Sequence, residues 1–155
     1  MEDFTDFDTG AVSEIQLSYL PKVKPGDRPM VCTSSEVYKI LKDTWDFRTF
    51  EFVEQFKVML LNRVNRVIGI CTISTGSSTG TVADPKLVFV VALKANANSI
   101  ILCHNHPSGN LQPSTHDIDL TKRMSEIGRL LDLKVMDHLI VTTDGYYSFA
   151  DQGAL

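Results

Sequence analysis

The side chains best suited to chemistry gather in one short stretch of this chain. All four histidines lie between positions 104 and 138, and His104 and His106 stand at alternate positions. They directly follow the apolar run 99–103 (SIILC), which predicts a buried strand. Because residues i and i+2 of an extended backbone project to the same side, the two imidazoles can reach one ion while Asn105 faces away. This spacing favours a metal site at the end of the strand.

The start of the next predicted helix offers a third ligand. Residues 114–117 (STHD) have the pattern of a helix N-terminus, with Ser114 at the cap and Asp117 in the first turn. The loop before them can fold back so that this helix start faces the strand end. Two imidazoles and one carboxylate are a ligand set of catalytic zinc, which leaves a fourth position open. The sequence therefore predicts Zn²⁺ bound by His104, His106 and Asp117.

Each of these features has a simpler explanation when it is taken alone. A His-x-His pair is often a pair of surface or capping histidines. Asp117 alone would be a carboxylate that stabilises the helix dipole, and Ser114 alone would be an ordinary N-cap. Their joint occurrence in one compact segment, directly after a buried strand, favours the metal site.

The same stretch carries a family resemblance. HNHPSGNLQPSTHD resembles the JAMM (MPN-plus) metalloprotease signature, in which His-x-His-Pro is followed after six residues by Ser-x-x-Asp. Together with the later segment 137–141 (DHLIV), it is similar in particular to the bacterial RadC family, from about Phe52 to the C-terminus. The resemblance implies a zinc peptidase or isopeptidase whose metal is bound by the two histidines and Asp117. It also implies that the Ser114 hydroxyl hydrogen-bonds the developing oxyanion.

Such a site also needs a carboxylate that takes a proton from the attacking water. The resemblance places this glutamate at the start of an early strand. The segment 53–62 (VEQFKVMLLN) is similar to the family's Glu-x-Phe-basic-Val stretch, which gives the role to Glu54. Glu51, also followed by an aromatic residue, is the competing candidate. The alternative interpretation of Glu54 is an exposed charge at a strand edge.

The remaining histidines and the cysteines have weaker signals. His138 is interpreted either as a partner behind the metal ligands or as a buried histidine with satisfied hydrogen bonds, and His116 matches no position of the signature. The cysteines are odd in number and form no CxxC pair, so neither a disulfide framework nor a cysteine-based zinc ribbon is supported. They are Cys32, Cys71 and Cys103. Strand alternation predicts that Cys103 points away from the metal.

The elements around these residues predict a mixed α/β or α+β fold, with a central mixed sheet flanked by helices. The resemblance implies the fold shared by JAMM proteins and cytidine deaminases. Besides the strand and helix above, the predicted elements are a strand over 15–20, a helix from the capping box at Thr33 to about Trp45, strands over 56–61 and 67–74, a helix opened by Asp84 and Pro85, and strands over 134–141 and 146–149. The core face expected for the helix from Ser114 consists of Ile118, Met124, Ile127, Leu130 and Leu131.

Size and composition indicate one soluble globular domain. The chain has 155 residues, 43% of them hydrophobic and 22% charged. We expect an N-terminal extension over 1–30, with one possible strand and a loop, and a RadC/JAMM-like domain over 31–155. No apolar run is long enough to cross a bilayer, and the first residues are acidic where a secretory signal is basic. The expected location is the cytoplasm, with no membrane partner.

Three classes of function compete. The first is a zinc peptidase or isopeptidase that acts on a peptide or protein. The second is a DNA-repair or mobile-element accessory protein that binds nucleic acid or protein partners without peptidase activity; a net charge of −4 argues against a broad grip on phosphate backbones. The third is a metal-dependent nuclease or deaminase, although the Pro-Cys-x-x-Cys segment of zinc deaminases is absent from the sequence. The substrate and the oligomeric state are left open.

Overall fold

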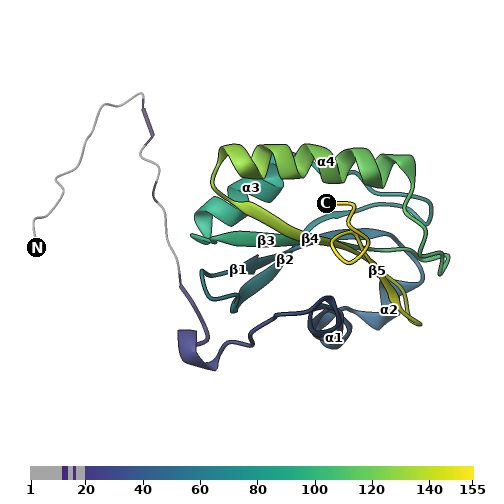
Figure 1. The fold of residues 1–155 in the computed structure, drawn as a ribbon, viewed down its shortest axis with the longest axis horizontal. Helices are drawn as coiled ribbons and strands as arrows, with labels where there is room; N and C mark the ends of the chain where they lie inside the picture. Colours follow the sequence, from purple (N-terminus) through teal and green to yellow (C-terminus); the bar gives the residue numbers. More distant parts are fainter. Residues whose placement is uncertain (1–11, 14–15, 17–19) are drawn as a thin grey trace, which may run out of the picture.

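Figure 1 shows the fold in the computed structural model, which describes residues 12–13, 16 and 20–155. Most of the strand predicted over 15–20 lies outside the described residues. In chain order the elements are η1 (Pro25–Asp27), α1 (Ser34–Thr44), α2 (Phe47–Phe50), β1 (Gln55–Leu61), β2 (Val67–Thr75), α3 (Pro85–Lys94), β3 (Ser99–Asn105), α4 (Thr115–Leu130), β4 (Lys134–Val141) and β5 (Tyr146–Ser148). The predicted helices and strands of this part of the chain are confirmed, whereas η1 and α2 were not predicted. Within the described residues, no helix combines the length and apolar character needed to cross a bilayer.

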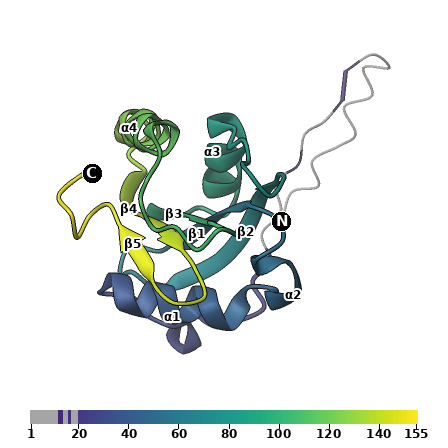
Figure 2. The same cartoon turned by 90° about the vertical axis from the view of Figure 1, so that its right-hand side faces the viewer.

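The five strands form one mixed sheet in the order β2-β1-β3-β4-β5. β3 and β4 pair in parallel, and the other neighbours are antiparallel. Helices α1 and α2 lie on one face of the sheet, and α3 and α4 lie on the other (Figure 2). The predicted α/β class, a mixed sheet flanked by helices, is confirmed.

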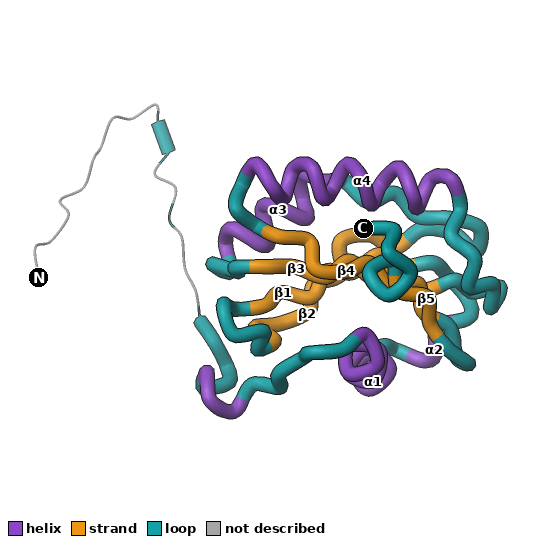
Figure 3. Tube along the Cα trace, in the orientation of Figure 1, coloured by secondary structure: helices purple, strands orange, loops and turns teal. Residues whose placement is uncertain are grey.

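Strand β3 lies in the middle of this sheet and is buried along its whole length (Figure 3). Its residues alternate between two hydrophobic clusters. Ile101 and Cys103 pack on the side of α1, whereas Ile100 and Leu102 pack on the side of α3 and α4. His104 continues the second row, so its imidazole projects toward α4. The prediction that Cys103 points to the opposite face is confirmed.

Cys103 is an unreactive thiol at that position. Its thiol donates a hydrogen bond to the Lys57 carbonyl at 3.3 Å. Burial raises the pKa of the Cys103 thiol to about 12. Because only a thiolate acts as a metal ligand or nucleophile, this cysteine serves the core.

The core face predicted for α4 was wrong in part. Met124 is fully buried and Ile127 packs against the core, but Ile118, Leu130 and Leu131 are 38%, 76% and 41% exposed. The residues that turn inward are Asp117, Thr121, Met124 and Gly128. At Gly128 a Cβ would lie 2.3 Å from the Leu133 carbonyl oxygen, so the helix can approach the next segment closely only through a glycine. This contact and two inward polar side chains set the rotation of the helix.

A buried carboxylate anchors the C-terminal turn. Asp137 in β4 accepts hydrogen bonds from the Ser148 hydroxyl at 2.6 Å, the Ala150 amide at 2.9 Å and the His138 amide at 2.7 Å. Burial raises the pKa of this carboxyl, and the three hydrogen bonds partly oppose the shift. Asp137 therefore helps to attach the segment after β5 to the sheet, together with Phe149, whose amide donates to the His138 carbonyl at 3.1 Å.

We expect Asp137→Ala to lower the free energy of unfolding by about 2–4 kcal/mol, because it leaves buried donors unsatisfied. Urea denaturation monitored by circular dichroism measures the change. The exposed Asp43→Ala on α1 is the matched control and should change stability by less than about 0.5 kcal/mol. Equal effects of the two substitutions would show that the anchor contributes nothing.

Candidate metal centre

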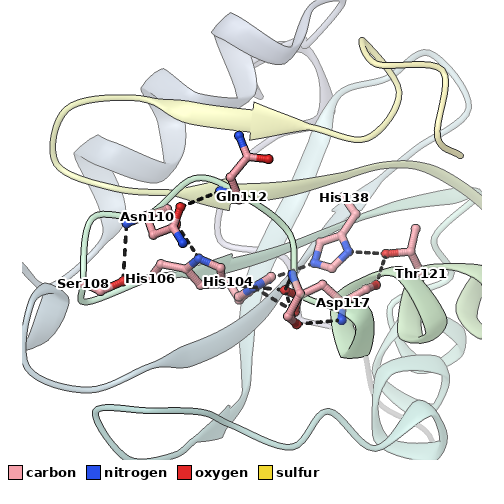
Figure 4. Close-up of polar contacts among 9 residues, drawn as sticks. His104, His106, Ser108, Asn110, Gln112, Asp117, Thr121 and His138 are labelled. Atoms are coloured by element: carbon pink, nitrogen blue, oxygen red, sulfur yellow. Dashed lines mark hydrogen bonds and ion pairs between the residues drawn. The ribbon is translucent and has the colours of Figure 1, made fainter.

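Three side chains converge at the end of β3: His104 from the strand, His106 from the residue just after it, and Asp117 from α4 (Figure 4). His104 Nε2 lies 2.9 Å from His106 Nε2 and 3.2 Å from Asp117 Oδ1, and His106 Nε2 lies 3.8 Å from Asp117 Oδ2. Ligands about 2.0–2.1 Å from one tetrahedral zinc ion lie roughly 3.3 Å apart, so these separations fit one shared ion. Among the residues that the structure describes, these form the one cluster of three or more His, Cys, Asp or Glu side chains able to hold a metal ion.

The loop after β3 folds back and orients His106. The His106 amide donates to the Val141 carbonyl at 3.1 Å and so continues the pairing of β3 with β4 by one residue. Its Nδ1 lies 2.6 Å from the Asn110 carbonyl oxygen, and the Gly109 amide donates to the His106 carbonyl at 3.0 Å. Gly109 has a φ of 78°, a left-handed conformation that glycine adopts without strain. These contacts hold the His106 ring at its Nδ1 edge, so that Nε2 faces His104.

Asp117 is oriented by the cap of its own helix. Ser114 is the N-cap, as predicted: its hydroxyl oxygen accepts from the Asp117 amide at 3.1 Å. The Ser114 amide and hydroxyl both donate to Asp117 Oδ2 at 2.7 Å. Burial raises the pKa of the Asp117 carboxyl, but the hydrogen bond and charge of His104 and the hydrogen bonds from Ser114 outweigh burial and lower it below its ordinary value. The carboxylate is ionised at neutral pH, as a metal ligand must be.

Asn105, between the two histidines, faces the other way, as predicted. Its side-chain oxygen accepts from the Gln55 amide at 2.7 Å, and its side-chain nitrogen donates to the carbonyls of Phe50 and Val53 at 2.6 and 2.9 Å. These bonds surround the backbone of Glu54. Asn105 thus ties the start of β1 to the end of β3, a role that the sequence analysis missed. The only sequence signal for this role was a polar residue placed just after an apolar run that predicts a buried strand.

A cavity of about 660 Å³ opens beside the three converging side chains. Glu54 and Ser114 line it together with His106 and Asp117. The Glu54 backbone is fixed by hydrogen bonds with Ser77 and Gly76, at 2.9 and 2.8 Å. The structure thus places the predicted glutamate and serine in the lining of one cavity.

The competing glutamate lies elsewhere. Glu51 Oε1 accepts a hydrogen bond from the Thr143 hydroxyl at 3.3 Å, and Glu51 does not line the cavity. His116 is exposed and lines the cavity, but it is no member of the converging group. The geometry favours Glu54 over Glu51, and its role in proton transfer stays a prediction.

His138 satisfies both interpretations that the sequence left open. It is fully buried, and its Nε2 lies 2.9 Å from His104 Nδ1. Its Nδ1 lies 2.6 Å from the hydroxyl oxygen of Thr121, and its ring stacks on Phe149. Burial lowers the pKa of His138 well below its ordinary value, so the ring is neutral. Thr121 was missed as well; its signal was a position four residues after Asp117, on the same helix face.

A comparison with protein families agrees with this geometry. The model described as the RadC-like JAB domain matches residues 31–154. The chain belongs to the RadC-like JAB domain family.

Individual relatives of this RadC-like chain carry names without an activity. It is 48% identical over 100 residues to a UPF0758 protein of Flavobacterium johnsoniae, a match that covers 64% of this chain and 44% of the relative. It is 43% identical over 103 residues to a UPF0758 protein of Symbiobacterium thermophilum, covering 66% and 44%. A UPF0758 protein of Clostridium kluyveri is 36% identical over 132 residues, covering 85% and 57%. The chain therefore spans about half the length of these relatives.

We expect His106→Ala to lower zinc affinity by more than the ~10–100-fold that loss of an outer-shell partner costs, because it removes a direct ligand. Metal analysis after dialysis and competition with a chromophoric chelator measure the loss. His116→Ala removes the same side chain from the exposed wall of the same cavity and should retain zinc. Equal zinc binding by wild type and His106→Ala would contradict the assignment.

Proposed function

We propose that this RadC-like JAB domain is a zinc-dependent hydrolase of the JAMM type that cleaves peptide or isopeptide bonds. The observation that carries the proposal is the convergence of two imidazoles and a carboxylate beside a cavity that Glu54 and Ser114 also line. When bound there, zinc would supply Lewis-acid catalysis, polarising a carbonyl and making water more acidic. The membership of the family supports the same reaction class.

Glu54 would carry the proton. The attacking water gives its oxygen to the carbonyl carbon, and the carboxylate of Glu54 accepts the released proton. As the C–N bond breaks, Glu54 returns this proton to the leaving amine, so the carboxylate is unchanged at the end of the cycle. The position on the cavity wall and the two backbone hydrogen bonds to residues 76 and 77 support this role, because they hold the carboxylate's backbone at a constant place.

Ser114 would stabilise the oxyanion that forms on the substrate. Its hydroxyl proton is directed to Asp117 Oδ2 at 2.7 Å, and the same oxygen also accepts from the Ser114 amide. The hydroxyl can therefore turn toward the substrate while the amide still holds the Asp117 carboxylate. A donor that is released only when negative charge develops stabilises the transition state more than the ground state.

The lining of the cavity supports a peptide over a nucleic acid. Its described residues are mostly hydroxyl, amide and glycine groups, with Glu54 and two histidines, and include neither lysine nor arginine. Phosphate backbones are bound mainly through such cations. The relatives extend beyond the region matched here, so the substrate of a whole protein of this family is part of the proposal.

We expect Glu54→Gln to reduce hydrolysis at least ~10²-fold while zinc stays bound, because only proton transfer is lost. The assay uses a peptide, an isopeptide-linked conjugate and a single-stranded oligonucleotide, and Glu51→Gln is the matched control with near wild-type activity. Loss of activity in Glu51→Gln instead would transfer the role to Glu51. Cleavage of the oligonucleotide alone would overturn the peptidase proposal.

We expect Ser114→Ala to lower kcat by about 10²–10³ with a small change in KM, since an oxyanion donor acts in the transition state. The substitution also removes a helix cap that contributes about 1 kcal/mol, so the folded fraction is checked by circular dichroism. An unchanged kcat in folded protein would assign Ser114 to capping alone.

A further inference from the structure

A row of buried hydrogen bonds leads from the backbone of α4 to Nδ1 of His104, the ring nitrogen that does not face His106 and Asp117 (Figure 4). The Thr121 hydroxyl donates to the Asp117 carbonyl oxygen at 2.6 Å. The same hydroxyl oxygen lies 2.6 Å from His138 Nδ1, and His138 Nε2 lies 2.9 Å from His104 Nδ1. The three relay side chains are at most 1% exposed, so water cannot replace these partners.

The direction of these hydrogen bonds follows from the backbone carbonyl of Asp117, the one group in the row that cannot act as a donor. A backbone carbonyl only accepts, so the single proton of the Thr121 hydroxyl is used on Asp117. The hydroxyl can then only accept from His138, which places the proton of that ring on Nδ1. The rings of Phe56 and Phe149 pack against the His138 ring, whose two nitrogens contact Thr121 and His104, so no carboxylate is hydrogen-bonded to the ring to stabilise a second proton on it. Its Nε2 therefore carries a lone pair.

The same reasoning reaches the metal ligand. Because His138 Nε2 accepts, His104 Nδ1 must carry a proton and donate it. With that proton held on Nδ1, the nitrogen of His104 that remains for a metal is Nε2, the atom that faces His106 and Asp117. His106 reaches the same tautomer by a shorter route, because its Nδ1 donates directly to the Asn110 carbonyl at 2.6 Å. Both imidazoles thus present Nε2 to the same point.

We propose that Thr121 and His138 are positioning residues whose one-way hydrogen-bond relay fixes His104 in the tautomer that binds metal through Nε2. This inference rests on the metal site of the proposed function and does not depend on peptide hydrolysis. The relay ends on the carbonyl of Asp117, whose side chain is itself a proposed ligand. Two ligands from different elements are therefore linked through the first turns of α4.

Thr121→Val tests the relay, because valine keeps the shape of threonine and removes the hydroxyl. His138 then loses the acceptor for its Nδ1 proton and can move that proton to Nε2, where it opposes the proton of His104. We expect zinc affinity to fall about 10–100-fold, as for other outer-shell partners of metal-bound histidines. Thr121→Ser keeps the hydroxyl and should restore most of the affinity. Chelator competition measures both values.

Met124→Ala is the structural control. Met124 is buried on the same face of α4 and takes no part in the relay, so its truncation should destabilise the fold without changing zinc affinity. A fall in affinity for Met124→Ala equal to that for Thr121→Val would overturn the relay, because general loosening of the helix would then explain both.

Nitrogen-15 NMR of the histidine rings tests the relay without measuring catalytic activity. In the wild-type chain we expect His104 Nδ1 to carry a proton both without zinc and with it, and zinc to bind at Nε2. An unprotonated Nδ1 in the wild type overturns the inference even if Thr121→Val does not fold. Loss of zinc in His104→Ala with unchanged affinity in Thr121→Val defeats the relay alone. Unchanged zinc binding in His104→Ala defeats the metal site, and with it the proposed function.

Discussion

The site depends on keeping three electron-pair donors together, at separations of 2.9–3.8 Å between their nearest atoms. Such atoms repel one another unless a cation or a proton lies between them. The fold opposes this repulsion by placing the donors on elements that cannot separate easily. β3 is buried along its whole length and pairs on both sides, and the first turn of α4 is closed by reciprocal hydrogen bonds between Ser114 and Asp117.

Much of this arrangement could be predicted from local sequence. The apolar run before His104 predicted a buried strand, and strand alternation then placed Cys103 and Asn105 away from the site. The Ser-x-x-Asp pattern predicted the cap and with it the direction of the Asp117 carboxylate. These inferences succeeded because period and capping are properties of a few neighbouring residues.

The errors and omissions concern contacts between distant segments. The core face of α4 was assigned from its apolar residues, whereas Thr121 and Gly128 turn inward because of His138 and Leu133. The role of Asn105 depends on carbonyl groups about fifty residues earlier in the chain. The hydrogen-bond partner of a buried polar residue is present only in the assembled fold, so the sequence shows where such a residue stands but does not identify its partner.

The amide of Asn105 also bears on how this domain can change over time. It holds the backbone on both sides of Glu54 from a position between the two histidines, and residues 78–81, which line the same cavity, take no part in that contact. Asn105 therefore fixes the position of Glu54 relative to the two histidines without contacting residues 78–81, although Ser77, which accepts from the Glu54 amide, also donates to the Gly80 carbonyl at 2.9 Å. Exchanges at positions 78 and 79 that keep the Ser77–Gly80 pairing can therefore change the lining of the cavity while Glu54 and the two histidines keep their places, so the ligand that the cavity accepts can change over time without rebuilding the candidate metal centre.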